Sequence, residues 1–236
     1  AIEALGFKAL TPIQAQCLPL LRKGLDVIGQ SQTGSGKTLA FALPLLEKIE
    51  TKNKTPQALV LCPTRELCDQ VARTVRSLAR FKKDLLVTTI VGGQPAYHQI
   101  KTLSHGTQIV VGTPGRVGDL IQRGKLDLSQ VHSVVLDEAD RMLDMGFRDA
   151  IESILGFTPA KRQTALFSAT FPSTIESLSK RFQKSPVKIA IEVPDSEKPK
   201  IEEFAYCIAE ANRLTTLTRI LVENAHESVL VFCNLK

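Results

Sequence analysis

Six short apolar runs alternate with longer amphipathic stretches, and this alternation restricts the chain to few folds. The apolar runs cover residues 26–30, 57–62, 85–91, 108–111, 133–136 and 164–167. Helical patterns cover residues 37–49, 65–80, 95–103, 115–123 and 142–155. Such alternation predicts an α/β fold, a parallel sheet with helices on both faces. In such sheets ligands bind at the carboxyl ends of the strands, and we expect the functional residues there.

Composition excludes several other classes of protein. The 236 residues carry 30 Lys and Arg against 24 Asp and Glu, and 43% of them are hydrophobic. These values are close to the average for globular proteins and do not fit a disordered, collagenous or coiled-coil chain. The apolar runs are far shorter than the roughly 20 residues that span a bilayer. We therefore expect a soluble protein with no membrane contact. We also expect it to be cytoplasmic and monomeric.

The cysteines and histidines form no recognisable cluster. The five cysteines include no CxxC pair, and the four histidines are far from them in sequence. This pattern argues against a disulfide framework and against a zinc site, and it fits a reducing compartment. The chain also has no Trp and only 2 Tyr, so any nucleic acid would be bound through its backbone rather than by base stacking.

The character of the sequence changes after residue 192. Residues 193–200 are polar, charged and carry two prolines, which is typical of a linker. Beyond them we expect two strands, 204–208 and 229–232, around a helix at 212–224. These residues are too few for an independent core. The predicted organisation is a first domain at 1–192, a linker at 193–200, and the truncated start of a second domain at 201–236.

A phosphate-binding loop is predicted at residues 31–38, SQTGSGKT, between a strand and a helix. Glycines let the backbone approach phosphate, and the start of the helix directs N–H groups at it. Lys37 would reach the β- and γ-phosphates and the Thr38 hydroxyl would bind Mg²⁺. Ser31 stands where the strict pattern has Gly. The predicted nucleotide-binding residues of the loop are Thr33, Gly34, Ser35, Gly36, Lys37 and Thr38.

A matching acidic element follows the apolar strand that ends at Leu136. Asp137 would hold Mg²⁺, partly through water, while Glu138 would orient or deprotonate the attacking water. An ordinary helix start with acidic residues is the alternative interpretation. The two elements together, in order, favour nucleotide hydrolysis, with Lys37, Asp137 and Glu138 as the catalytic residues.

Residues 137–140 spell Asp-Glu-Ala-Asp, and with other segments they resemble the DEAD-box ATP-dependent RNA helicases. The further segments are Gly6-Phe7, Thr11–Gln14, Pro63–Leu67, Gly92-Gly93, Thr113–Arg116 and Ser168–Thr170. The resemblance covers about residues 1–192. Within the family, the segments 62–67, 92–95 and 137–147 look most like the bacterial DbpA group, which is linked to ribosomal RNA.

The resemblance implies a RecA-like fold, ATP and Mg²⁺ as cofactors, and RNA, in particular ribosomal RNA, as partner. It implies that Asp140, Ser168 and Thr170 couple hydrolysis to RNA binding. Gln14 can pair with adenine at N6 and N7, and Phe7 offers a stacking surface for the ring. A core position is an equally good interpretation of Phe7.

Three turns between a strand and a helix carry the expected RNA contacts. Each combines Thr or Gly with a nearby Pro, and two carry an Arg. Helix N-termini bind phosphate, and the guanidinium group offers bidentate donors. Simple helix capping explains Thr and Pro but not the arginines. The predicted RNA-binding residues are Pro63, Thr64, Arg65, Gly92, Gly93, Thr113, Pro114, Gly115 and Arg116.

The function expected from the sequence is RNA unwinding or remodelling by an RNA-dependent ATPase, in ribosome assembly. A non-unwinding RNA-dependent ATPase clamp is the alternative. A GTPase would need an Asn-Lys-x-Asp element, and residues 53–56 (NKTP) lack the Asp. Because the arginine finger of the second domain is not in this sequence, we expect the isolated chain to be nearly inactive.

Overall fold

The structure is a computed structural model that describes residues 9–80, 82–191, 202, 204–223 and 228–233. The chain divides into two compact units, Ala1–Glu192 and Val193–Lys236. Among the described residues, no helix is both long enough and apolar enough to cross a membrane.

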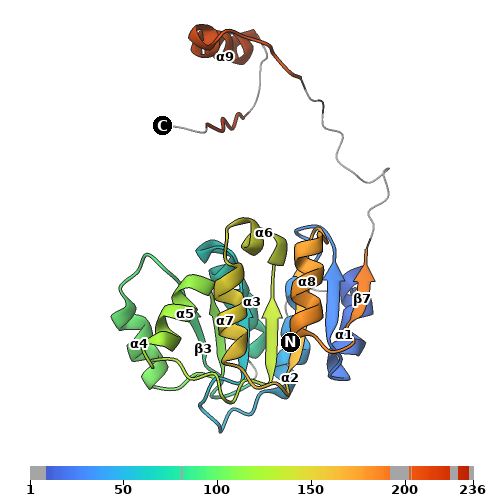
Figure 1. Cartoon of the computed structure of the whole chain (residues 1–236), viewed down its shortest axis with the longest axis vertical. Coiled ribbons are helices and arrows are strands. Elements are labelled where there is room, and N and C mark those ends of the chain that lie inside the picture. Colours follow the sequence, from blue (N-terminus) through green and yellow to red (C-terminus); the bar gives the residue numbers. More distant parts are fainter. Residues whose placement is uncertain (1–8, 81, 192–201, 203, 224–227, 234–236) are drawn as a thin grey trace. The chain divides into compact units, whose positions relative to one another are not determined.

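The first unit is built on one parallel sheet of seven strands (Figure 1). Their order across the sheet is β3-β4-β2-β5-β6-β1-β7. All six strands predicted from the apolar runs form, which confirms the α/β fold. The strands are β1 (Val27–Gln30), β2 (Ala58–Leu61), β3 (Val87–Ile90), β4 (Ile109–Gly112), β5 (Ser133–Leu136), β6 (Gln163–Ser168) and β7 (Val187–Ala190).

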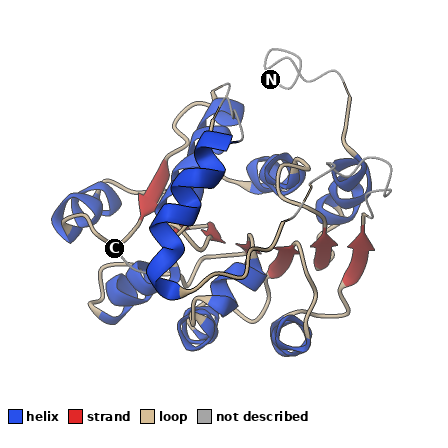
Figure 2. Ribbon diagram, turned by 90° about the horizontal axis from the view of Figure 1, so that it is seen from above, coloured by secondary structure: helices blue, strands red, loops and turns tan. Residues whose placement is uncertain are grey.

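Helices cover both faces of the sheet (Figure 2). One hydrophobic cluster joins the sheet to α1, α2 and α3, and a second joins its other face to the helices from α4 to α8. Side chains alternate along each strand, so a continuous apolar strand supplies both clusters. The helices are α1 (Pro12–Arg22), α2 (Lys37–Lys48), α3 (Arg65–Ala79), α4 (Ala96–Ser104), α5 (Pro114–Gln122), α6 (Ala139–Asp144), α7 (Arg148–Gly156) and α8 (Ser173–Phe182).

The structure differs from the sequence prediction in several elements of the first unit. The helix expected at 142–155 is two helices, α6 and α7, because Gly146 between them adopts a φ of +78° that ends α6. The sequence analysis did not predict α1, α8 or β7. Strand β7 is an edge strand with a single buried residue, Ile189, so its apolar signal was weak.

In the second unit, the helix expected at 212–224 is present as α9 (Arg213–Glu223), after a short 3-10 turn at Glu210–Asn212. The prediction of strands at 204–208 and 229–232 is wrong, since both segments are described and neither forms a strand. A strand needs a neighbouring strand to satisfy its backbone groups. The linker predicted at 193–200 lies outside the described residues, and the assignment of 201–236 to a second domain stays a prediction.

Candidate functional site

The predicted functional segments meet at one edge of the sheet, because parallel strands all end on the same side. In the register of the sheet, Gln30 lies opposite Ser168, and Leu61 lies opposite both Gly112 and Leu136. The residues that follow β1, β5 and β6 therefore lie on one part of this edge. The three turns predicted to bind RNA follow β2, β3 and β4 on the neighbouring part.

The loop between β1 and α2 has the backbone of a phosphate cradle. Gly34 and Gly36 have φ values of +80° and +88°, a region that favours glycine, and Gly36 directly precedes α2. Lys37 is buried, and its Nζ donates to the carbonyl oxygens of Ser31 (2.7 Å) and Gln32 (3.1 Å). Burial lowers the pKa of Lys37, although nearby carboxylates oppose the shift. The ammonium is thus held within the loop, where phosphate would be bound.

Ser31, the residue that departs from the strict glycine pattern, closes this loop. Its hydroxyl lies 2.8 Å from the hydroxyl of Ser35, and its backbone N–H donates to the carbonyl of Ser168 at 3.1 Å. The side chain therefore crosses the base of the loop, and the backbone ties the loop to β6. A serine at this position is compatible with the predicted cradle.

Two adjacent carboxylates emerge where β5 ends. Asp137 is almost fully buried, and its Oδ1 accepts a hydrogen bond from the backbone N–H of Glu138 at 3.1 Å. Burial raises the pKa of Asp137 to about 6, with Lys37 opposing the shift and Glu138 adding to it. Glu138 has φ +50° and ψ 52°, a left-handed conformation that is uncommon outside glycine. Strained backbone of this kind clusters at functional sites.

Asp140 connects the end of β5 to the end of β6. Its Oδ2 accepts hydrogen bonds from both the backbone N–H (2.9 Å) and the hydroxyl (2.8 Å) of Thr170. Burial raises the pKa of Asp140, but the hydrogen bonds from Thr170 and its other neighbours outweigh it, so the pKa lies below its ordinary value. The structure thus joins Asp140 and Thr170 directly, with Ser168 buried at the end of β6.

A cavity of about 330 Å³ lies between the loop and the carboxylates. Thr38 and Asp137, the predicted Mg²⁺ ligands, both line it with hard oxygen donors. Mg²⁺ usually keeps several waters and takes one or two carboxylates plus substrate phosphate, so this donor set fits it. Gln70 and Thr74 of α3, which also line the cavity, were missed by the sequence analysis because they belong to no motif. The lining residues are Thr33, Gly34, Gly36, Lys37, Thr38, Leu39, Leu67, Gln70, Thr74, Asp137 and Glu138.

Gln14 lies against the same loop. Its Nε2 donates to the Gly36 carbonyl at 3.0 Å, and its Oε1 accepts from the backbone N–H of Thr11 at 3.0 Å. The Thr11 hydroxyl donates to the Ser35 carbonyl at 2.8 Å. Gln14 is buried, and because an amide group offers two N–H donors and two acceptor positions, these two bonds use one of each. Phe7, the predicted stacking residue, lies outside the described residues.

Arg65 and Gly93 form one unit on the neighbouring part of the edge. A Cβ placed on Gly93 would lie 1.7 Å from Nη2 of Arg65. Gly93 also has a φ of +69°. The glycine therefore allows the guanidinium to lie directly against the turn backbone, and the structure brings together two residues that are far apart in sequence.

Arg116 is engaged within the protein. Both of its Nη atoms donate to the carbonyl of Gln94 at 3.1 Å, and Nη1 also donates to Oε1 of Gln99 at 3.3 Å. The sequence analysis assigned this fork to RNA phosphate. The structure shows the guanidinium bracing the turn that contains Gly92 and Gly93, and the contact with RNA stays a prediction.

Helix capping accounts for part of the three turns. The Thr64 hydroxyl accepts from the backbone N–H of Leu67 at 3.3 Å, as an N-cap does. Pro114 is the first residue of α5, but Thr113 makes no side-chain capping bond. Thr113 and Pro114 are buried, whereas Arg65 and Gly93 are exposed. The exposed members are those able to meet a ligand from solvent.

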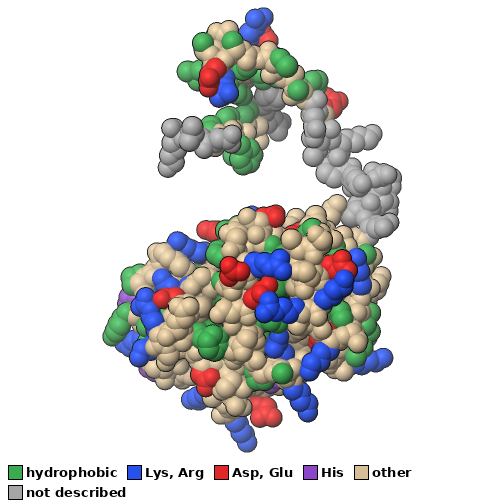
Figure 3. Space-filling view, in the orientation of Figure 1, with side chains coloured by type: hydrophobic (Ala, Val, Ile, Leu, Met, Phe, Trp, Pro, Cys, Tyr) green, Lys and Arg blue, Asp and Glu red, His purple; other side chains and the backbone are tan. Residues whose placement is uncertain are grey.

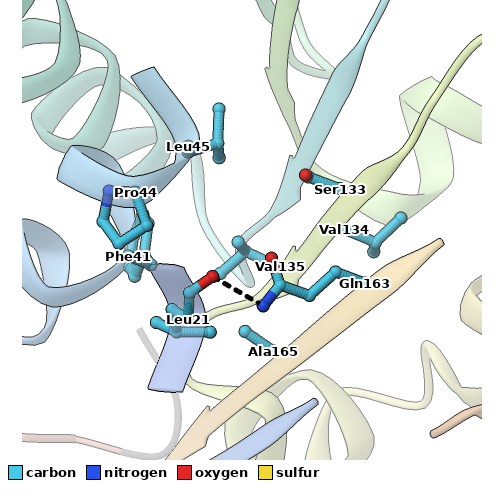
Figure 4. Close-up of a pocket in the computed structure, with 9 residues that line it drawn as sticks. All are labelled: Leu21, Phe41, Pro44, Leu45, Ser133, Val134, Val135, Gln163 and Ala165. Carbon is cyan, nitrogen blue, oxygen red and sulfur yellow. Dashed lines mark hydrogen bonds between the residues drawn. The ribbon is translucent and has the colours of Figure 1, made fainter. Parts of the chain in front are cut away.

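Two further cavities in the described part of the chain, about 360 Å³ between β3 and α4 and about 530 Å³ along α9, are not lined by a lysine together with two carboxylates. Lysine and arginine side chains are scattered over the face shown in Figure 3, with acidic side chains among them. A cavity of only about 10 Å³ lies near the amino ends of β5 and β6, where Gln163 donates to the carbonyl of Leu21 (Figure 4). Such a volume holds at most one water. Among the described residues, no group of three or more His, Cys, Asp or Glu side chains could hold a metal ion.

Comparison with known proteins places these features in a family. The sequence model described as DEAD/DEAH box helicase matches residues 11–178. The chain is 47% identical over 235 residues to the ATP-dependent RNA helicase DbpA of Escherichia coli, covering 100% of this chain and 51% of that protein. It is 46% identical to the DEAD-box ATP-dependent RNA helicase CshA of Geobacillus kaustophilus, covering 98% of this chain and 50% of that protein. The chain thus spans about half the length of these curated relatives.

A solved structure agrees. The crystal structure of a DEAD box protein from Methanococcus jannaschii superposes with a TM-score of 0.79 at 40% identity, covering 93% of this chain and 59% of that one. This supports a RecA-like arrangement of the sheet and helices. The family match covers most of the first unit and includes all the described segments that meet at the edge of the sheet. The chain belongs to the DEAD/DEAH box helicase family.

Proposed function

We propose that the first unit is the ATP-binding domain of an ATP-dependent RNA helicase, which hydrolyses ATP with Mg²⁺ in step with RNA binding. One observation carries the proposal: Lys37, Thr38, Asp137 and Glu138 line a single cavity at the carboxyl edge of the sheet. Phosphate-binding, metal-binding and base functions are thereby within reach of one bound triphosphate.

Each residue has a separate task in this proposal. Lys37 would exchange its bonds to the loop carbonyls for phosphate oxygens. Thr38 and Asp137 would hold Mg²⁺, which when bound neutralises phosphate charge. Glu138 would orient the attacking water and accept its proton. Gln14 would present its remaining donor and acceptor to adenine, with Phe7 as a stacking surface.

Coupling to RNA would run along the edge of the sheet. Asp140 and Thr170 join the ends of β5 and β6, with Ser168 beside them, so a shift of one strand end would move the other. The RNA backbone would be bound by the turns after β2, β3 and β4, with Arg65 as the exposed cation and Arg116 bracing the Gly92-Gly93 turn. These contacts carry no base information.

Several further parts of the proposal rest on resemblance. Residues 193–200 would link this domain to a second RecA-like domain that begins at 201. The likeness of residues 137–147 to the DbpA group supports ribosomal RNA as substrate and ribosome assembly as setting. We further propose that the protein acts as a cytoplasmic monomer.

The test compares hydrolysis of ATP and GTP, with and without single-stranded RNA, in a form of the protein about as long as its curated relatives. We expect ATP hydrolysis that RNA stimulates, no GTP hydrolysis, and no activity in Lys37→Ala. Equal use of GTP, or hydrolysis indifferent to RNA, would contradict the proposal.

A further inference from the structure

The Glu138 carboxylate is bound by an arginine that the proposed mechanism does not use. Nη1 of Arg141 donates to Oε2 of Glu138 at 2.8 Å. The two residues are three positions apart, on the same side of the start of α6, which lies at the carboxyl edge of the sheet in Figure 1. The Glu138 side chain is 12% exposed and that of Arg141 58%. The contact therefore stands where the cavity meets solvent.

The local backbone does not fix the direction of this carboxylate. Glu138 occupies the N-cap position of α6, yet its side chain makes no capping hydrogen bond. Its left-handed φ of +50° turns the chain sharply between Asp137 and α6. Lys37, the nearest buried cation of the loop, is bonded to loop carbonyls instead. Among the described residues, Arg141 supplies the hydrogen bond that orients the Glu138 side chain.

We propose that Arg141 is a positioning residue that holds the Glu138 carboxylate in the orientation needed to align the attacking water. The inference rests on the proposed function, in which Glu138 acts on that water. Arg141 also donates its backbone N–H to Oδ1 of Asp140 at 3.1 Å. One residue thus contacts both the catalytic carboxylate and the carboxylate that is joined to Thr170.

An ordinary surface ion pair is the competing explanation, since exposed pairs at this spacing stabilise proteins little. The chain contains a matched example. Arg148 donates to Glu152 at 3.0 Å on α7, with side-chain exposures of 45% and 17%. Glu152 is bound by a second arginine, Arg181, and its pair is spaced i,i+4 rather than i,i+3, but the functional difference is that Glu138 lines the cavity and Glu152 does not. The Arg148–Glu152 pair is therefore the control.

The expected effect is on the rate rather than on nucleotide binding. Arg141 does not line the cavity, so the KM for ATP should change by less than about twofold. A catalytic group misplaced by 1 Å can cost on the order of 100-fold. Loss of one orienting bond from a side chain that stays in place should lower kcat by roughly tenfold.

The experiment measures RNA-stimulated ATP hydrolysis in the longer form of the protein for wild type, Arg141→Gln, Arg141→Lys, Arg148→Gln and Glu138→Gln. We expect Arg141→Gln to lose kcat at nearly constant KM, Arg141→Lys to recover much of it, and Arg148→Gln to match wild type. Lysine keeps a charged donor at this position, so its recovery separates positioning from folding damage.

Three results would overturn the inference: Arg141→Gln with the kcat of Arg148→Gln, a raised KM with unchanged kcat, or Arg141→Lys no better than Arg141→Gln. The proposed function is tested separately, by the activities of wild type and Glu138→Gln. A wild type without RNA-stimulated hydrolysis, or a fully active Glu138→Gln, would reject the role of Glu138 itself. An active wild type with an unaffected Arg141→Gln would reject the role of Arg141 alone.

Discussion

Gly93→Ala should separate RNA binding from stability more clearly than any charge deletion. The new Cβ would lie 1.7 Å from Nη2 and 2.1 Å from Cζ of Arg65, so the guanidinium must move. Arg65 is exposed, so its displacement into solvent should cost little folding energy. The backbone cost comes from the φ of +69°, where a Cβ is disfavoured by roughly 1–2 kcal/mol.

Gly24→Ala supplies the matched control. Gly24 has a φ of +79°, and a Cβ there would meet nothing within 4 Å. Both variants should therefore lose about 1 kcal/mol of unfolding free energy, which lowers the Tm of a domain of this size by about 2–4 °C. Thermal unfolding of the chain itself measures this. The equality of the two losses is the first check.

Only Gly93→Ala should weaken RNA binding. Loss of one charged contact to phosphate costs about 1.5 kcal/mol, or roughly tenfold in Kd. The slope of log affinity against log salt should fall by about 0.7, equally for unrelated single strands. Fluorescence anisotropy at several salt concentrations, on the longer form of the protein, measures both. If Gly24→Ala weakened binding as much, or if the loss depended on RNA sequence, Arg65 would not be the backbone contact.

Three further predictions address the nucleotide cavity, the link between strands, and the thiols. Lys37→Ala should weaken ATP binding by roughly tenfold or more in calorimetry, because it removes a charged donor to phosphate. Glu138→Gln should bind ATP within about threefold of wild type. Equal ATP affinities of the two variants would refute this division of roles. Asp140→Ala should lose about 2 kcal/mol of unfolding free energy at neutral pH. Because the pKa of Asp140 is lowered in the folded protein, the extra stability of wild type should be fully present above pH 3.8, its ordinary pKa, and should shrink in more acidic buffer. If the difference in unfolding free energy between wild type and Asp140→Ala did not change with pH, the ionised carboxylate would not be its source. In the native protein the exposed Cys207 and Cys233 should react quickly with a thiol reagent, and the three buried cysteines should react only after unfolding. Counting the thiols modified per chain before and after unfolding measures this.

Much of the fold was predictable, since local chemistry determines it. Continuous apolar runs such as the one at 57–62 form strands covered on both faces, and β2 appears there. The glycines of the loop at 31–38 and the carboxylates after β5 could be picked out as candidate site residues, because glycine lets the backbone approach phosphate and Mg²⁺ prefers oxygen ligands such as carboxylates. Weakly apolar elements such as β7 were not predicted, because an edge strand buries few side chains and therefore has few apolar residues.

Contacts between distant segments could be decided only by the tertiary structure. Arg65 and Arg116 look alike in sequence, each beside a Thr and a Pro, yet one lies exposed against Gly93 while the other braces the carbonyl of Gln94. Gln70 carries no motif and reaches the cavity because α3 packs beside the loop. Sequence determines which groups a chain carries and which local conformations they favour. Which groups meet depends on the order of the strands, since that order places segments dozens of residues apart at one edge of the sheet.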